Sequence, residues 1–320
     1  MAKRQWWRWL VGAVAAGALL YFAGGTWAVH QLIVALLQVE RVLPADPPAT
    51  DTKALGFHGD PLAAFGLGFE DVEIATPLGP APAWLIPAAG EARRTWAIYV
   101  HGIGGRREDG YRYLPILHEA GFPLLMITYR NDDGAPMTAD GLHGYGVSEW
   151  PDLEAAVDFA KGLGATDVLL VGDSMGGAIT GQFLAQSDRA VSVSAVILDS
   201  PALDFGERVT FALGKAGFAF APVLTALAQQ TVGLQRGLAI AEAVAIDQLA
   251  AFAWPVLLIH GTGDQVIPVS TGDRLLARRV GITTMLRTGA DHLRTSADHP
   301  ALFDATLRTF LDSLKTEAPR

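Results

Sequence analysis

The sequence has no cysteine and little basic charge. Because none of the 320 residues is a cysteine, disulfides, thiolate metal sites and a cysteine nucleophile are excluded from this chain. The 24 Lys and Arg residues are outnumbered by 33 Asp and Glu residues, which gives a formal net charge of -9. A nucleic-acid partner is not expected, since no stripe of cations is available to neutralise phosphates. Half of the residues are hydrophobic, which is enough to build a sizeable core.

Charge is also missing from a long apolar stretch near the N-terminus. Lys3, Arg4 and Arg8 precede an uncharged run over residues 9–39. Within it, residues 10–29 alone supply the roughly 20 apolar residues that a bilayer needs. The run therefore has the length and the basic flank of a membrane span.

Tryptophans gather at the start of this run, where the interfacial aromatic belt of a membrane span would lie. We expect residues 1–8 to be cytoplasmic and residues 9–37 to form a transmembrane signal anchor. The positive-inside rule then places the rest of the chain outside the cytoplasm, in a single-pass protein of the cell membrane. A cleaved signal peptide and a soluble helix are the alternatives, although the apolar core of a signal peptide is about 7 to 15 residues long.

After a linker rich in Pro, Asp and Thr, predicted over residues 38–67, a single domain is expected over residues 68–316. Short apolar runs alternate there with helix-like segments, and the first two runs are expected to pair with each other. The later runs are apolar on both faces, as parallel strands covered by helices are. The class is therefore a doubly wound, mostly parallel α/β sheet. The expected strands cover residues 70–76, 83–88, 95–100, 122–129, 166–171, 193–199, 254–260 and 282–287.

One serine follows such a strand and precedes a helix. In "LLVGDSMGGAIT" Ser174 lies between Gly172 and Gly176, and the small residues let the strand and the helix approach closely. A serine on this sharp turn is exposed at the carboxyl edge of the sheet. Ser174 is thus a candidate nucleophile.

A serine nucleophile needs an imidazole base and a carboxylate that orients the base. "LIHGTGDQVIP" places Asp264, and "LRTGADHLRTS" places His292, in loops at the same carboxyl edge as Ser174. Asp199, which also ends a strand, is the alternative acid, and His299 is a weaker candidate for the base.

Several other polar residues are interpreted as structural. His101, His143 and His260 are expected to satisfy local hydrogen bonds. Asp291 is not assigned as the orienting acid, because the side chains of neighbouring residues in an extended loop diverge.

From about residue 68 to its C-terminus the chain resembles the α/β-hydrolase family. The resemblance rests on "VHGIGG", "GDSMGG", "HGTGDQVIP" and "GADH", in this order. It implies a serine hydrolase with Ser174 as nucleophile, His292 as general base and acid, and Asp264 as the residue that orients His292. The backbone N–H groups of Met175 and Ile103 are the expected oxyanion donors. No cofactor and no metal are expected.

An apolar insertion over about residues 203–252 takes the position of the cap in this family. Residues 216–235 carry no charge, yet a membrane crossing there would put Ser174 and His292 on opposite sides of the bilayer. A helical cap is therefore favoured over a second span. Its residues Phe218, Phe220 and Leu224 are expected to bind substrate above the serine or to face the nearby bilayer.

The favoured function is cleavage of carboxylic ester or thioester bonds, through an acyl-enzyme, in a small-molecule or lipid-like substrate with an apolar acyl group. A serine peptidase or an acyltransferase on the same fold is the alternative within enzymes. A non-catalytic binding protein on a hydrolase scaffold is the alternative of another class.

Overall fold

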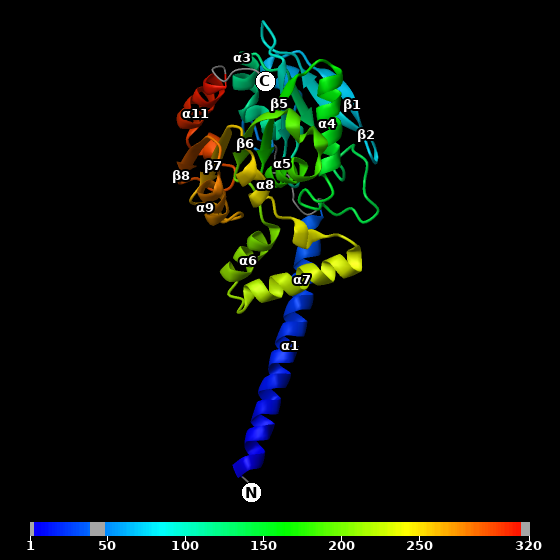
Figure 1. The fold of residues 1–320 in the computed structure, drawn as a ribbon, viewed down its shortest axis with the longest axis vertical. Helices are drawn as coiled ribbons and strands as arrows, with labels where there is room; N and C mark the ends of the chain where they lie inside the picture. Colours follow the sequence, from blue (N-terminus) through cyan, green and yellow to red (C-terminus); the bar gives the residue numbers. More distant parts are fainter. Residues whose placement is uncertain (1–2, 39–48, 315–320) are drawn as a thin grey trace.

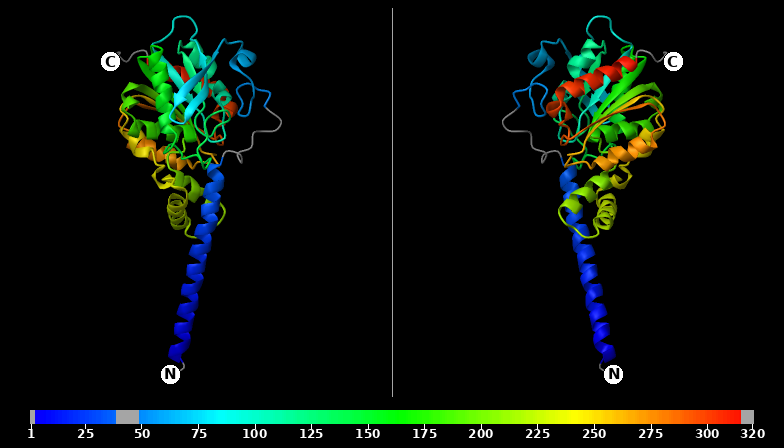
Figure 2. Two further views of the ribbon diagram at one scale, coloured as in Figure 1. Left: turned by 90° about the vertical axis from the view of Figure 1, so that its right-hand side faces the viewer. Right: turned by 90° about the vertical axis from the view of Figure 1, so that its left-hand side faces the viewer.

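A computed structural model describes residues 3–38 and 49–314 of the chain. A globular domain occupies one end, and the helix α1 (Lys3–Leu37) extends from it as a long rod (Figures 1 and 2). The helices and strands of the fold all lie within these described residues.

An eight-stranded sheet forms the centre of the domain, in the order β1-β2-β4-β3-β5-β6-β7-β8. β1 and β2 form an antiparallel pair, β2 also pairs antiparallel with β4, and all other neighbours are parallel. The strands are β1 (Glu70–Thr76), β2 (Gly79–Ile86), β3 (Thr95–Val100), β4 (Leu124–Ile127), β5 (Asp167–Asp173), β6 (Val193–Asp199), β7 (Val256–Gly261) and β8 (Thr283–Thr288).

The predicted fold class is confirmed. Every apolar run that was expected to be a strand overlaps one, and the bounds of β1, β3 and β6 are those predicted. The expected pairing of the first two strands is also present, and β2 begins at Gly79, earlier than predicted, because it follows the tight turn after Thr76.

Helices cover both faces of the sheet, as continuous apolar strands require. The helices α4, α5, α8 and α9 contribute to the core on one face, whereas α3 and α11 contribute to the core on the other. Along β5 the side chains alternate between these two cores, with Leu170 in the first and Leu169 and Val171 in the second. These helices are α3 (Leu114–Glu119), α4 (Trp150–Gly162), α5 (Met175–Gln186), α8 (Ile246–Ala251), α9 (Val269–Arg278) and α11 (Pro300–Ser313). The remaining short helices are α2 (Pro61–Phe65), η2 (Arg107–Arg112), η3 (Asp188–Ser192), η4 (Ile240–Glu242) and α10 (Thr295–Asp298).

The apolar insertion forms the two helices α6 (Phe205–Lys215) and α7 (Ala221–Arg236). Both lie on the side of the domain from which α1 extends, and α7 lies across α1 (Figures 1 and 2). The Tyr21 hydroxyl donates to the carbonyl of Ala219 at 2.6 Å. Farther along α1, Nδ1 of His30 lies 2.9 Å from Oγ1 of Thr231. The cap is therefore joined to α1 by hydrogen bonds as well as by packing.

The helix α1 has two different environments. Near its C-terminal end Val29, Ile33 and Leu37 are buried in the core beside the cap. Toward its other end the apolar side chains are exposed, and Leu19 retains 72% of its accessible surface. Residues 6–37 are long and apolar enough to span a membrane.

The predicted linker is partly folded onto the domain. Residues 39–48 lie outside the described residues, as do residues 315 and 316 at the predicted end of the domain, but α2 lies within the linker range. The rings of Phe57 and Phe65 pack on Tyr111, whose hydroxyl donates to the carbonyl of Gly59 at 2.6 Å. Aromatic packing of this kind, which composition does not reveal, orders the segment.

Candidate active site

Ser174 occupies a strained turn between β5 and α5. Its φ of 49° and ψ of -112° are unusual for a residue with a side chain. Two backbone hydrogen bonds hold the turn, from Ser174 N to the Asp199 carbonyl and from Ala202 N to the Ser174 carbonyl, both at 2.9 Å. Because the surrounding strands determine the turn, the serine hydroxyl stands at the carboxyl edge of the sheet.

Gly176 is required for this turn by close backbone packing. A Cβ atom at this position would lie 2.0 Å from the carbonyl oxygen of Val100 at the end of β3. At Gly172 a Cβ would lie 2.8 Å from the backbone of Gly176. The glycines of the serine motif therefore allow α5 to begin directly against the sheet.

The structure brings together the three residues predicted for catalysis. Nε2 of His292 lies 3.1 Å from Oγ of Ser174, and Nδ1 of His292 lies 2.8 Å from Oδ2 of Asp264. Asp264 follows β7 and His292 follows β8, so three parallel strands supply the three side chains at one edge. This is the hydrogen-bonded order that a serine nucleophile, a base and an orienting acid require.

Asp264 is held as a carboxylate. Burial alone would raise its pKa, but hydrogen bonds from His260, His292 and the backbone N–H of Ile267 lower the pKa below its ordinary value of 3.8. Oδ1 accepts from the N–H groups of Val266 and Ile267, each at 2.8 Å. Oδ2 is therefore left to face His292.

The two predicted oxyanion donors lie in suitable places. Met175 is the first residue of α5, and Ile103 lies in the loop that follows β3. In the part of the chain that the structure describes, neither N–H donates to a protein acceptor. A Cβ at Gly102 would lie 3.1 Å from Cβ of Ser174, which shows how closely this loop approaches the nucleophile.

A buried hydrogen bond between His101 and Asp132 holds the loop after β3. Nε2 of His101 lies 2.9 Å from Oδ2 of Asp132, and Oδ2 also accepts from the backbone N–H of Tyr129 at 2.8 Å. Burial would lower the pKa of His101, but Asp132 raises it above its ordinary value. His101 is thus structural, as expected, and it supports the loop that carries Ile103.

Beneath Ser174 lies a charged cluster that the sequence did not reveal. Arg112 is fully buried, and its Nη2 lies 2.6 Å from Oδ2 of Asp173 and 3.7 Å from Oδ2 of Asp199. The hydroxyls of Tyr99 and Tyr113 donate to Asp173 at 2.5 Å and 2.8 Å. Burial raises the pKa of Asp199 to about 6, against the lowering effect of Arg112. The alternative acid is therefore engaged with Arg112, away from Nδ1 of His292.

Two residues that sequence reasoning did not assign hold the histidine loop. Oγ of Ser200, which has a φ of 46°, accepts from the N–H of Leu293 at 3.2 Å. Oδ1 of Asp291 accepts from the N–H groups of Gln265 and His292, at 2.8 Å and 2.7 Å. Asp291 therefore ties the acid loop to the histidine loop without facing the imidazole.

His260 and His143 differ in their partners. Nε2 of His260 lies 3.3 Å from the carbonyl oxygen of Ile267 and from Oδ2 of Asp264. His143 is fully buried with Nδ1 3.5 Å from Oε1 of Glu149, but among the described residues neither of its ring nitrogens has a hydrogen-bond partner, so the hydrogen bonds expected for His143 are not present. His299 immediately precedes α11, outside the serine site. In the described residues, no group of three or more His, Asp or Glu side chains is arranged to hold a metal ion.

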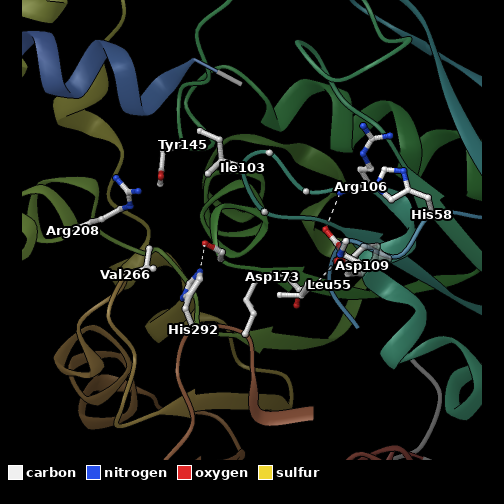
Figure 3. A pocket seen from close by; sticks show the side chains of 17 residues that line it. Leu55, His58, Ile103, Arg106, Asp109, Tyr145, Asp173, Arg208, Val266 and His292 are labelled. Carbon is white, nitrogen blue, oxygen red and sulfur yellow. Dashed lines mark hydrogen bonds between the residues drawn. The ribbon is translucent and has the colours of Figure 1, made fainter. Parts of the chain in front are cut away.

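A cavity of about 420 Å³ opens beside the serine (Figure 3). The cap contributes one residue to its wall, Arg208 of α6. Phe218, Phe220 and Leu224, the cap residues expected to bind substrate, do not line it. The cavity is lined by Leu55, Gly56, His58, Tyr99, Gly102, Ile103, Gly104, Gly105, Arg106, Asp109, Tyr145, Asp173, Ser174, Arg208, Val266, His292 and Leu293.

The three cap residues instead lie near α1. Leu224 is buried, and a Cβ at Gly25 would lie 2.9 Å from one of its methyl groups. The rings of Phe220 and Phe22 are 5.6 Å apart, and Phe218 is exposed. Leu224 and Phe220 thus pack against α1 and do not line the substrate pocket where they were expected.

Comparisons with known proteins place the fold of this chain among the α/β-hydrolases. No family model matches the chain. The uncharacterized protein YqkD of Bacillus subtilis is 24% identical over 222 residues, which cover 68% of this chain and 71% of that protein. An esterase of Pyrococcus furiosus has a TM-score of 0.63 and 18% identity, over 84% of this chain and 97% of its own. An esterase from Exiguobacterium antarcticum has a TM-score of 0.55 and 17% identity, over 76% of this chain and 100% of its own. At these identities the likeness shows the fold.

Proposed function

We propose that this chain, whose fold is that of the α/β-hydrolases, is a serine hydrolase that cleaves carboxylic ester or thioester bonds. The hydrogen-bonded series from Ser174 through His292 to Asp264 carries the proposal, with distances of 3.1 Å and 2.8 Å. A protein that used this scaffold only for binding would need none of these contacts. The esterases among the structural neighbours support the same class.

The proposed reaction proceeds through an acyl-enzyme. Oγ of Ser174 attacks the carbonyl carbon of the ester while Nε2 of His292 accepts the hydroxyl proton. The N–H groups of Ile103 and Met175 stabilise the oxyanion. His292 then gives the proton to the departing alkoxide or thiolate. Water attacks the acyl-enzyme with His292 again as base, which releases the carboxylic acid and restores Ser174.

The walls of the cavity support a substrate with a short to medium apolar acyl group. Leu55, Ile103, Val266 and Leu293 contribute aliphatic surface beside the serine. Each methylene that such walls bury contributes about 0.8 kcal/mol, which corresponds to a roughly fourfold preference at most. The charged groups of a peptide would gain nothing from this aliphatic part of the wall. The cavity therefore favours an esterase over a peptidase.

A panel of chromogenic substrates tests this function. We expect p-nitrophenyl esters to be cleaved much faster than p-nitroanilides of peptides, and kcat/KM to rise with acyl length until the cavity is filled. Ser174→Ala is the matched control, because it leaves the fold and the cavity in place. Preference for the anilides would favour a peptidase. If transfer of the acyl group to an added alcohol exceeded hydrolysis, the chain would be an acyltransferase.

We further propose that α1 is a single-pass anchor and that the catalytic domain lies outside the cytoplasm. The apolar length of α1, its exposed outer half and its basic start support this proposal. The full-length protein should remain in the membrane fraction after extraction with high salt. Protease added outside the membrane should digest the domain, whereas complete protection would contradict this orientation.

A further inference from the structure

The cap exposes an apolar surface to solvent, which is unfavourable in water. The side chains on the side of α7 that faces away from the domain, called here the outer face of α7, include one amide and no charge. Its exposed residues are Pro222, Val223, Ala226, Leu227, Gln230 and Leu234. Because the inner face of α7 is also apolar, this helix is apolar around most of its circumference.

The loop before α7 extends this surface. Phe218 and Phe220 are 40% and 63% exposed, and Leu234 at the other end of α7 is 87% exposed. An exposed apolar patch of this kind is typical of a surface that contacts a membrane, another protein or a ligand. An exposed cation, Arg236, ends the helix, whereas the Lys215 ammonium before the loop donates to Gln265.

The position of α7 along α1 identifies what covers the patch. Contacts between the cap and α1 begin at Tyr21 and Phe22, and Leu224 lies against Gly25. At about 1.5 Å per residue, the free helix from Trp9 to Tyr21 is only about 18 Å long. A bilayer core is about 30 Å thick. A span that begins at Trp9 therefore still lies within the bilayer at the level of α7.

The spacing of two tryptophans on α1 also places α7 at the level of the bilayer. Trp9 is 80% exposed and Trp27 is 68% exposed. Their 18-residue separation corresponds to about 27 Å along the helix, which is close to the distance between the two aromatic belts of a membrane span. Trp27 stands within two residues of Gly25, where α7 crosses α1 (Figure 1).

We infer that the outer face of α7, together with Phe218 and Phe220, docks on the bilayer that α1 spans. The proposal rests on the membrane-anchor part of the proposed function. In this arrangement α7 lies in the interface as an apolar helix, with Arg236 at its end available to the lipid phosphates. The cavity beside Ser174 is then held close to the membrane surface, where an ester carried by the bilayer can reach it.

The absence of cysteine allows a direct test by single-cysteine labelling of the full-length protein in lipid vesicles. Leu227→Cys places a fluorescent label on the outer face of α7, and Leu19→Cys places one in the exposed half of α1. Val280→Cys is the aqueous control, since Val280 is 78% exposed and lies shortly before β8, at the sheet edge opposite the cap. Quenching by brominated lipids should be strong at positions 19 and 227 and absent at position 280.

Each other outcome contradicts a different part of the inference. Quenching at position 19 without quenching at 227 would overturn docking of the cap and leave the anchor intact. Quenching at neither position would overturn both. A label at 227 that is shielded from an aqueous quencher but is not quenched by lipid would mean that protein, such as a second copy, covers the patch, and docking would again be overturned.

Activity provides a second and independent measurement. The pair Leu227→Lys and Leu234→Lys, combined in one variant, should lower cleavage of an ester embedded in vesicles by roughly tenfold. Cleavage of a short soluble ester should be unchanged, since neither residue lines the cavity. Val280→Lys is the matched control and should change neither rate. Equal rates of the double variant and the wild type on vesicles, or an equal loss on both substrates, would overturn the inference.

Discussion

Oδ2 of Asp264 faces Nδ1 of His292 at 2.8 Å, across 28 residues of sequence. The other candidate acid, Asp199, instead lies beside Arg112, with Oδ2 3.7 Å from Nη2. Two carboxylates at the carboxyl ends of neighbouring parallel strands, one ending β6 and one in the loop after β7, thus have different partners. Only Asp264 is placed to fix the tautomer of the imidazole and to stabilise its protonated form.

Replacing these two acids should therefore have unequal effects. Asp264→Asn is expected to lower kcat by about 10⁴-fold, because the amide favours the wrong tautomer of His292. Asp199→Asn should cost far less, since Asp199 does not touch the imidazole. Initial rates on a p-nitrophenyl ester, measured on folded protein, compare the two. A larger loss in Asp199→Asn would move the orienting role to that residue.

Asp264 should also make stability depend on pH. Because its pKa in the folded protein lies below the ordinary value of 3.8, its contribution to the free energy of unfolding is present above that value. The contribution is lost as the pH falls toward the folded pKa. The difference in Tm between wild type and Asp264→Asn in detergent should therefore shrink from pH 7 to pH 3. A difference that grows toward acid pH would contradict the hydrogen-bonded carboxylate.

Gly176 should tolerate no side chain. Gly176→Ala places a Cβ against the carbonyl of Val100, which is fixed in β3. We expect a loss of stability of about 3 kcal/mol or more and no activity. Gly162→Ala is the matched control at the exposed end of α4, where a Cβ meets nothing within 4 Å. That change should raise stability by about 0.5–1 kcal/mol. Equal denaturation midpoints for both variants would refute the packing argument.

Arg208 should influence which esters are accepted. Its guanidinium stands over the ring of Tyr145, 5.7 Å from the centroid, in the wall of the cavity that holds Ser174. Within the described residues, the stacking on Tyr145 is the contact found for this side chain, which leaves its N–H groups available to a substrate anion. Arg208→Gln should lower kcat/KM for a monoester of a dicarboxylic acid about tenfold relative to a neutral ester of equal length. Arg208→Lys should keep most of the preference. A ratio unchanged by the Gln variant would remove Arg208 from substrate binding.

Much of the fold and of the site could be predicted from local pattern. Buried parallel strands are continuous apolar runs, so β3 and β6 could be bounded from the sequence. Parallel strands share a direction, so the loops after β5, β7 and β8 had to meet at one edge. That geometric fact places Ser174, Asp264 and His292 together without any knowledge of the loops themselves.

The features that escaped prediction depend on contacts between distant segments. The sequence around Arg112 carries no signal of burial, although Asp173 and Asp199, which end neighbouring strands in register, could have suggested a shared cation. The cap residue Leu224 was expected at the substrate because its partner Gly25 belongs to a helix that was treated separately. The sequence of an apolar segment indicates that the segment is buried against something, but it does not identify the element or ligand that buries it.

A fluorophosphonate probe tests the assignment of the nucleophile most directly, because it reacts with an activated serine. The full-length protein should be labelled, and peptide mass spectrometry should locate the adduct on Ser174 alone. Ser174→Ala should lose labelling together with about 10⁴- to 10⁶-fold of its ester hydrolysis, while its Tm stays close to that of the wild type. Labelling at another serine, or near-normal turnover by Ser174→Ala, would contradict the assignment of this site.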